Sequence, residues 1–281
     1  MPLNRIEILK IPKIKCFCGS NSFTKIYQGT RPFEFLILKC TQCRVCRTLP
    51  FPGTKAKDFF IDNKEILNYT LNKFQVKMDR NRFKRDCRMI QTQNTLSPYI
   101  LDIGCNIGLF ASYALEEGLN VFSIDVNTKR IHFAHCAVKR RMCVADANYI
   151  PFSKDSFDCV NLSHVLEHLE EPLQALSEIK HVLKSDGLLI INVPNYKGLI
   201  PLLRPVSWQG WSPQTHFWHF TPKTLVSLLQ RMDFKVTESK LTAMCPPQIN
   251  NWFKRVIYRV LSGLGERCGM GDNILVVARK V

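Results

Sequence analysis

Strands and helices alternate regularly from residue 99 to residue 281, and this alternation limits the fold more than any other feature. Seven short apolar runs have the length of buried strands, and helical patterns or turns separate them. The runs are YILDIG (99–104), NVFSIDV (120–126), MCVADA (142–147), FDCVNLS (157–163), LLIINVP (188–194), FKVTES (234–239) and NILVVARK (273–280). The sequence therefore predicts an α/β fold, in which a parallel sheet of seven strands is covered by helices on both faces. In such sheets the ligand binds at the carboxyl ends of the strands.

The turn after the first run, LDIGCNIGLF (101–110), carries the glycines that a ligand-binding turn needs. Gly104 allows the backbone to approach a ligand closely, and Gly108 allows the next helix to begin close to the strand. The dinucleotide-binding pattern requires glycine at 106 and 109, where this chain has Asn106 and Leu109. The turn therefore disfavours a nicotinamide or flavin dehydrogenase. Asn106 is a mild replacement, because asparagine tolerates left-handed backbone conformations.

Three acidic residues follow the first three strands, namely Asp102, Asp125 and Asp146. The order of D-x-G-x-x-x-G, an acid 23 residues later and then an Asp-Ala pair resembles the class I S-adenosylmethionine-dependent methyltransferases. The later segments FDCVNLSHVLEHLEEP, LKSDGLLIINVPN and HFWHFTPKTLVSLLQRMDFKV resemble the branch that acts mostly on small molecules, including sugar, quinone and natural-product enzymes. The resemblance covers roughly 97–281, and several members of this branch also begin with a cysteine-rich module.

The resemblance implies a Rossmann-like methyltransferase sheet, S-adenosyl-L-methionine as the cofactor, and in-line methyl transfer to a small-molecule acceptor. It also implies a role for each site residue. The methionine part of the cofactor would lie among Asp102, Gly104, Cys105 and Gly108. Asp125, followed by Val126, would bind the ribose hydroxyls, and Asp146 and Ala147 would hold the adenine. Ser163 and His164 would lie beneath the sulfonium. A carboxylate suits the ribose because it offers two acceptor oxygens.

The segment His164–His168, HVLEH, also fits an H-x-x-E-H pattern of zinc peptidases. On a helix this spacing places both imidazoles on one face. A zinc hydrolase needs a third ligand, however, and the sequence offers no obvious one. Because the segment follows the fourth strand, we expect it to face the cofactor and the acceptor. Among the histidines near the strand ends, His168 and His216 are the candidate catalytic bases, with packing or orientation as the alternative role.

Five of the twelve cysteines are spaced like the ligands of a zinc ribbon. Cys16 and Cys18 form one pair, and Cys40 and Cys43 form a second about twenty residues later, so four thiolates could enclose a structural zinc. Gly19 supports a turn after the first pair. The first pair is C-x-C instead of the usual C-x-x-C, so Cys46 is a spare that could replace Cys18. The alternative is a small β-rich module with free thiols.

The charge of the chain is concentrated in its first third. Residues 1–97 carry 19 Lys and Arg against 7 Asp and Glu, whereas residues 98–281 carry 20 against 16. These observations divide the chain into a zinc-ribbon-like module (1–59), a basic helical connector (60–96) and a methyltransferase domain (97–281). Apolar residues such as Ile66, Leu67, Leu71 and Phe74 give the connector its helical spacing. The basic part leaves a second function open, an RNA or DNA methyltransferase that docks through this region.

Two segments of the second half have unusual composition. Residues 196–220 are too long and too aromatic for a simple connection, and they predict either a substrate wall or a satellite core. Residues 250–265 predict an amphipathic helix that packs on its own domain, with contact to a membrane surface or a partner as the alternative. The sequence has no apolar run long enough for an export signal or a membrane span, so we expect a cytoplasmic protein.

Overall fold

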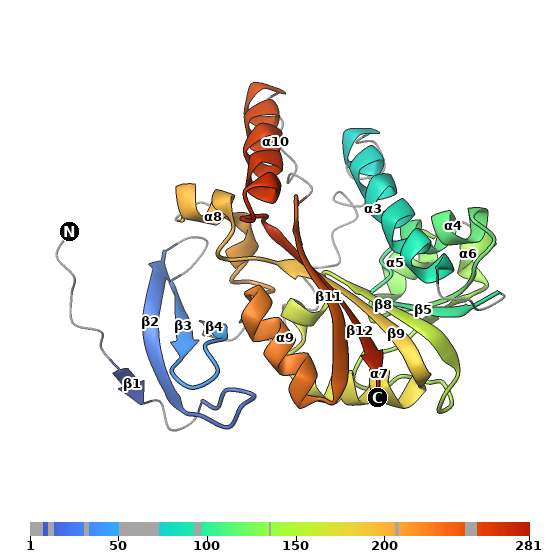
Figure 1. Cartoon of the computed structure of the whole chain (residues 1–281), viewed down its shortest axis with the longest axis horizontal. Coiled ribbons are helices and arrows are strands. Elements are labelled where there is room, and N and C mark those ends of the chain that lie inside the picture. Colours follow the sequence, from blue (N-terminus) through green and yellow to red (C-terminus); the bar gives the residue numbers. More distant parts are fainter. Residues whose placement is uncertain are drawn as a thin grey trace.

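The computed structural model describes residues 8–10, 14–30, 34–50, 73–92, 97–134, 136–205, 208–244 and 252–281. Within these ranges the strands form two sheets, one of seven strands and one of five. Figure 1 shows the two sheets beside each other, with the first strands of the smaller sheet in blue.

The larger sheet contains the seven strands that the sequence predicts. They run in the order β11, β12, β9, β8, β5, β6, β7. Their bounds are β5 (Tyr99–Ile103), β6 (Asn120–Asp125), β7 (Met142–Val144), β8 (Phe157–Ser163), β9 (Leu183–Pro194), β11 (Phe234–Thr242) and β12 (Asn273–Lys280). Strands β5 to β9 are parallel. Strand β12, in contrast, is antiparallel to both of its neighbours, β9 and β11. The expectation of a parallel sheet is therefore correct for all strands except β12, whose connection from β11 returns it to the same edge of the sheet.

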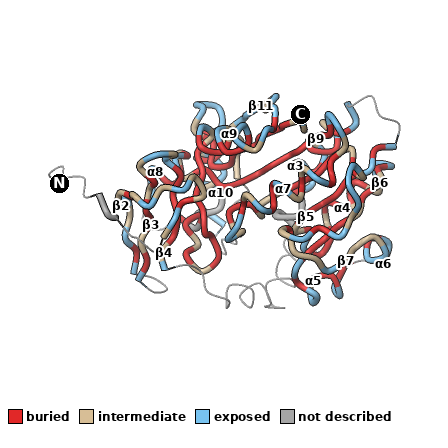
Figure 2. Tube along the Cα trace, turned by 90° about the horizontal axis from the view of Figure 1, so that it is seen from below, coloured by how far each residue is buried: buried red, intermediate tan, exposed pale blue. Residues whose placement is uncertain are grey.

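Helices cover both faces of this sheet, as expected. The helices are α3 (Lys73–Gln91), α4 (Leu109–Glu116), α5 (Thr128–His132), α6 (Cys136–Lys139), α7 (Pro172–Val182) and α9 (Pro222–Arg231). Successive strand residues point to opposite faces. Ile100 accordingly packs in one buried cluster with residues of α3 and α4, and Leu101 in another with residues of α7 and α9. Figure 2 shows this buried interior, with the exposed residues on the outer surfaces of the helices.

Local side chains and turns stabilise the ends of these helices. The side chain of Asn127 accepts hydrogen bonds from the backbone of Lys129 and Arg130 at the start of α5. Thr221 forms a capping box at the start of α9, and Pro222 occupies its first turn. Gly118 follows α4 with a φ of 77°, a conformation that glycine adopts without strain.

The smaller sheet joins the beginning of the chain to a segment more than 150 residues away. Its strands are β1 (Ile8–Lys10), β2 (Ser22–Gly29), β3 (Phe35–Cys40), β4 (Cys46–Leu49) and β10 (Trp218–His219), all antiparallel to their neighbours. Trp218 pairs with Arg47, and His219 pairs with Cys46. The N-terminal module is thus completed by a strand from the segment after β9, a connection that the sequence did not predict.

The aromatic residues of segment 196–220 fill the space between the two parts. Trp208 and Trp211 are buried with Phe35 and Ile37 of β3, beside α8 (Leu199–Leu203) and the short helix η2 (Gln209–Trp211). Phe217 and Trp218 belong to the main buried cluster. Trp208 and Trp211 therefore form a satellite core, which was one of the two expectations for this segment, whereas Phe217 and Trp218 extend the main core.

Helix α3 falls inside the predicted connector, but it packs on the larger sheet. The rings of Phe83 and Phe110 lie 5.7 Å apart in the cluster that α3 shares with α4. Ile66, Leu67 and Leu71 lie outside the described residues, and so does the side chain of Phe74. The division at residues 59 and 96 stays a prediction.

Helix α10 (Trp252–Arg267) confirms a helix in the predicted region, although 250 and 251 lie outside the described residues. Its later residues pack: Leu261 joins the cluster around Trp208, and Ser262 donates a hydrogen bond to Asp272. Trp252 and Phe253, in contrast, are 72% and 63% exposed. Val256, Ile257 and Val260 of the same apolar face are exposed as well. The expected packing on the domain is therefore correct for Leu261 but wrong for the other five apolar residues of this face. No helix in the described part of the chain is both long and apolar enough to cross a bilayer.

Candidate functional site

The turn after β5 has the geometry that its glycines predict. Gly104 and Gly108 have φ values of 68° and 77°, and Asn106 is also left-handed, at 55°. A Cβ atom on Gly104 would lie 2.3 Å from Cγ2 of Val165, so no larger residue fits without movement. Cys105 is buried in this turn, and its carbonyl accepts a hydrogen bond from the backbone of Gly108. The turn is therefore a compact loop that lies directly against the segment after β8.

Asp125 stands at the end of β6 with both carboxylate oxygens held by the backbone. Oδ2 accepts a hydrogen bond from Asn106 N–H at 2.8 Å, and Oδ1 accepts one from Asn127 N–H at 2.9 Å. Burial raises the pKa of Asp125, while these two hydrogen bonds lower it. Each oxygen keeps a second lone pair, so the fixed carboxylate can accept two further hydrogen bonds from a ligand.

Asp102 lies on β5, next to β6 and nearer the centre of the sheet, and it is fully buried. Asn161, its register partner on β8, donates a hydrogen bond from Nδ2 to Oδ1 of Asp102 at 2.7 Å. Burial raises the pKa of Asp102 to about 7. Sequence reasoning missed Asn161, although it lies two residues before Ser163 and so on the same face of β8.

Asp146, Ala147 and Val126 lie at the carboxyl edge formed by β6 and β7. Oδ1 of Asp146 accepts hydrogen bonds from the backbone and the side chain of Asn148, at 3.0 and 3.1 Å. Ala147 is buried, whereas the side chain of Val126 is about half exposed. An apolar surface thus stands beside a carboxylate, which suits a flat ring that carries an amino group.

Ser163 and His164 end β8 and turn the chain towards the same edge. His164 has a left-handed backbone, with φ 56°, and its N–H donates to the carbonyl of Asn192 on β9 at 2.8 Å. The hydroxyl of Ser163 is buried and makes no hydrogen bond among the described residues. An unsatisfied buried hydroxyl at the ligand edge is a polar group that a ligand could satisfy.

The histidines proposed as bases come together just beyond this edge. His168 belongs to the 3₁₀ helix η1 (Leu166–His168), and His216 precedes β10. Their ring centres are 4.5 Å apart, and Glu167 contributes a carboxylate to the same cluster. Burial lowers the pKa of both histidines, that of His216 to about 3. Both are therefore neutral near pH 7 and can offer a nitrogen lone pair.

Helix α3 brings polar residues to this region that the sequence did not single out. Arg85 donates hydrogen bonds to Asp86 at 2.7 Å and to Oδ1 of Asn192 at 3.0 Å. Asp86 is buried, which raises its pKa, and the charge of Arg85 opposes that rise. The sequence shows only a high density of basic residues at 77–88, because no local pattern distinguishes an arginine that faces the sheet from one that faces water.

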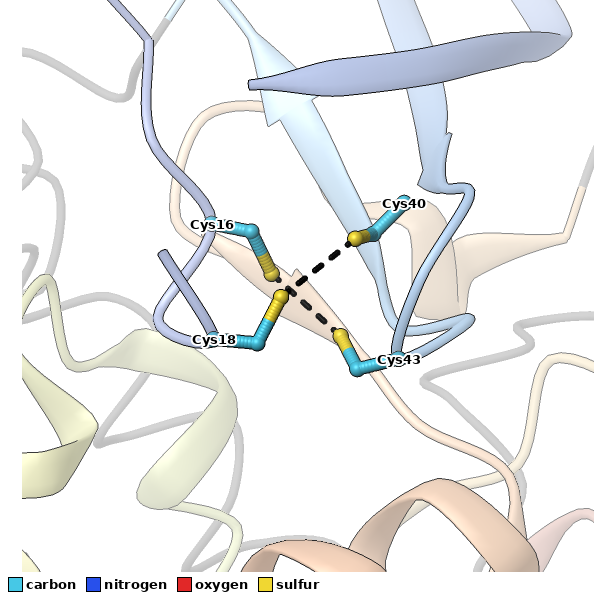
Figure 3. Close-up of side chains that lie close together, drawn as sticks. All are labelled: Cys16, Cys18, Cys40 and Cys43. Atoms are coloured by element: carbon cyan, nitrogen blue, oxygen red, sulfur yellow. Dashed lines mark hydrogen bonds between the residues drawn. The ribbon is translucent and has the colours of Figure 1, made fainter. Parts of the chain in front are cut away.

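The four predicted cysteine ligands meet at one end of the smaller sheet (Figure 3). Sγ of Cys16 lies 3.4 Å from Sγ of Cys43, and Sγ of Cys18 lies 3.6 Å from Sγ of Cys40. The hydrogen bond with Cys16 lowers the pKa of Cys43 to about 5. Gly19 has a φ of 91°, as expected for the turn after the first pair.

Cys46, which the sequence offered as a replacement for Cys18, lies outside this cluster of four cysteines. Cys46 is fully buried, and burial raises the pKa of its thiol to about 12, an effect that a hydrogen bond with Tyr196 opposes. Cys18 therefore occupies the fourth corner of the cluster, although it belongs to the unusual C-x-C pair.

A sequence model of a family described as a methyltransferase domain matches residues 78–239, more than half of the chain. An uncharacterized protein of Methanocaldococcus jannaschii is 36% identical over 101 residues, which are 36% of this chain and 43% of that protein. A ubiquinone biosynthesis O-methyltransferase of Actinobacillus pleuropneumoniae is 27% identical over 34% of this chain and 45% of its own length. The chain thus spans less than half the length of these relatives.

A solved structure of similar fold is an S-adenosylmethionine-dependent methyltransferase from Archaeoglobus fulgidus. It is 22% identical, with a TM-score of 0.54, and the match covers 78% of this chain and all of that one. At this identity the likeness concerns the fold, and it agrees with the seven-stranded sheet described above.

Proposed function

Because the chain belongs to the methyltransferase-domain family, we propose that it transfers a methyl group from S-adenosyl-L-methionine to a small-molecule acceptor. The observation that carries this proposal is Asp125, whose two oxygens are fixed by backbone amides beside the loop Gly104–Gly108. A carboxylate held in this way fits a ribose, whose two hydroxyls need two acceptors.

The other residues at this edge also fit the cofactor. The loop of Gly104, Cys105 and Gly108 and the buried Asp102 suit the methionine part, Asp146 with Ala147 and Val126 suits the adenine, and Ser163 with His164 suits the region of the sulfur. The orphaned hydroxyl of Ser163 supports this assignment, since a ligand would satisfy it. When bound, S-adenosyl-L-methionine supplies a methyl group that is already activated for displacement.

The protein's own task is then to align the acceptor, exclude water and remove a proton where the acceptor requires it. His168 and His216 are the residues that we propose for the acceptor side. Both are held near the carboxyl edge, where His168 donates to the carbonyl of Thr215. The O-methyltransferase of Actinobacillus pleuropneumoniae, which is named for ubiquinone biosynthesis, supports an acceptor of small-molecule size.

We further propose that Cys16, Cys18, Cys40 and Cys43 hold a structural zinc ion. Four thiolates at about 2.3 Å from a tetrahedral zinc lie about 3.8 Å apart, and the two measured separations are 3.4 and 3.6 Å. Zinc would complete the core of the smaller sheet and would stabilise the strand β4 to which β10 is attached.

Calorimetry with S-adenosyl-L-methionine tests the cofactor assignment. Replacing Asp125 with Asn keeps the shape of the side chain but removes its charge, so we expect binding to weaken about 100-fold. Asp233→Asn is a matched control, because the side chain of Asp233 is exposed and its left-handed backbone is one that asparagine also tolerates. Equal binding of all three proteins would overturn the assignment.

The acceptor class requires a separate experiment, in which the protein is mixed with methyl-labelled cofactor and either metabolite extract or RNA. We expect label in the small-molecule fraction. Label in RNA would instead favour the alternative, a nucleic-acid methyltransferase that docks through its basic N-terminal part. In the basic segment 77–88, Arg80, Arg82 and Arg85 already contact acids, namely Glu116, Asp79 and Asp86. The segment therefore has less free charge than its composition suggests.

A further inference from the structure

Glu167, His168 and His216 form a cluster that the sequence could not assemble. Glu167 and His168 belong to η1, whereas His216 lies almost fifty residues later, before β10. One ligand atom from each residue lies within 4.8 Å of the other two. A hydrogen bond from Phe217 N–H to the carbonyl of Glu167, at 2.8 Å, holds the two segments together. The cluster therefore combines Glu167 and His168 of the H-x-x-E-H pattern with His216, whereas His164 is not part of it.

The hydrogen bonds of the two imidazoles orient them as metal ligands. Nδ1 of His168 lies 3.0 Å from the carbonyl oxygen of Thr215, and Nδ1 of His216 lies 2.8 Å from that of Gly210. A carbonyl can only accept, so Nδ1 carries the proton in both rings. In a neutral imidazole the lone pair is then on Nε2. Metal-binding histidines characteristically donate their other nitrogen to a carbonyl or carboxylate in this manner.

Glu167 supplies an anion that the protein itself leaves unsatisfied. The residue is 1% exposed, and neither carboxylate oxygen makes a hydrogen bond among the described residues, although Nδ1 of His164 approaches Oε1 to 3.4 Å. A buried carboxylate without donors is costly unless a cation compensates it.

The three ligands also indicate which ion would bind. Two imidazoles and one carboxylate form the set of many catalytic zinc sites, which keep an open position for water or substrate. Magnesium and calcium prefer oxygen ligands, so two nitrogens disfavour them. The cluster stands close to the ligand edge, because Val165, just before η1, touches the loop at Gly104.

We propose that Glu167, His168 and His216 bind a divalent transition-metal ion of the zinc type, with an open position towards the acceptor. An oxygen of the acceptor takes this position, and the ion lowers the pKa of an acceptor hydroxyl, whose proton passes to solvent. His168 and His216 then act as ligands instead of free bases. The catalytic use of the ion rests on the proposed function, whereas binding of the ion does not.

Cobalt(II) is the probe that distinguishes this site from the cysteine cluster. Thiolate ligands give cobalt an intense charge-transfer absorption, whereas a site of nitrogen and oxygen ligands does not. We expect the metal-free full-length chain to bind two cobalt ions, of which one produces the thiolate absorption. His216→Gln and Glu167→Gln should each bind one ion with that absorption unchanged, which also reports that the fold is intact.

His219→Gln is the matched control. His219 is also buried, but its Nε2 lies 2.9 Å from Oγ1 of Thr48 and its ring centre is 6.1 Å from that of His216. This variant should keep two cobalt ions. The proposal is overturned if the unmodified chain binds only the thiolate-ligated ion, or if both cluster variants still bind two. Calorimetry with S-adenosyl-L-methionine on the same samples reports separately on the proposed function.

Discussion

Arg47 and Trp218 lie opposite each other across the β4–β10 pair, and the guanidinium carbon of Arg47 is 5.1 Å from the centre of the Trp218 ring. Arg47 is 1% exposed, and it also lies over the ring of Phe23 at 6.0 Å. One buried cation therefore connects the cysteine module to the strand that follows His216. The module and the segment that carries His216 form one packed unit, so a change in either should affect the other.

Replacing Arg47 with Ala should destabilise the protein by about 2–4 kcal/mol, because a buried side chain and its cation–π contacts are lost together. The free energy of unfolding in urea measures this effect. Tryptophan emission should shift to longer wavelength as Trp218 gains contact with water. Lys25→Ala removes the same charge from an exposed position of β2 and should change the stability by less than about 0.5 kcal/mol. Similar losses in both variants would contradict the role of Arg47.

Replacing Cys18 with Ser should weaken cobalt binding and reduce the thiolate absorption of bound cobalt, because only three thiolates of the four-sulfur cluster remain. Cys46→Ala should retain this absorption, since the thiol of Cys46 hydrogen-bonds with Tyr196 outside the cluster. If instead Cys46→Ala loses the absorption and Cys18→Ser keeps it, Cys46 replaces Cys18 as a ligand. Absorption spectra of the cobalt-loaded variants decide between these outcomes.

The positions of the residues that we propose for the cofactor could be predicted from the sequence, because the features that place them are local. Asp102 and Asp125 lie at the ends of recognisable strands and Asp146 just after one, and the parallel strands bring these ends to one edge of the sheet. Gly104 and Asn106 could be assigned to a tight turn because glycine and asparagine tolerate positive φ values, and both residues do have positive φ in the structure. In each case the physical requirement lies within a few residues of the side chain that meets it.

The remaining features depend on pairings over long distances in the chain. Trp218 meets Arg47 only because β10, a strand of two residues, joins the smaller sheet. A strand of two residues is too short to show a recognisable alternation of apolar and polar residues in the sequence. Glu167 and His216 meet through the same connection, so the cluster of Glu167, His168 and His216 could not be recognised from spacing. The reversed direction of β12 likewise follows from its neighbours in the sheet and not from its own residues.

Replacing Gly104 with Ala should weaken cofactor binding and lower the stability by about 1–3 kcal/mol. The new Cβ atom would lie 2.3 Å from Cγ2 of Val165, and the φ of 68° is unfavourable for alanine. Adding Val165→Ala should restore part of the loss, because it removes the clash but not the backbone strain. Gly263→Ala is the control: nothing lies within 4 Å of that position and it is inside α10, so alanine should be neutral or stabilising. Urea unfolding and calorimetry would show whether the double variant recovers; no recovery would exclude the contact with Val165 as the cause.

Asp102 should make the stability of the ligand-free protein depend on pH. Its pKa is raised to about 7 by burial, from an unfolded value near 3.8, so the folded state holds a proton that the unfolded state has lost between these two values. The stabilising contribution is therefore complete below about pH 3.8 and is lost as the pH rises through 7. Replacing Asp102 with Asn removes this titration but keeps an acceptor for Asn161.

We expect the stability of Asp102→Asn, relative to the unmodified chain, to increase by about 1 kcal/mol between pH 6 and pH 8.5. Urea unfolding at both pH values measures this difference, and comparing the two proteins at each pH cancels the titration of all other groups. Asp186→Asn, at a largely exposed position, should show no such change. A difference that stays constant with pH would mean that Asp102 is already ionised at pH 6 in the folded protein, and that its hydrogen bond with Asn161 outweighs its burial.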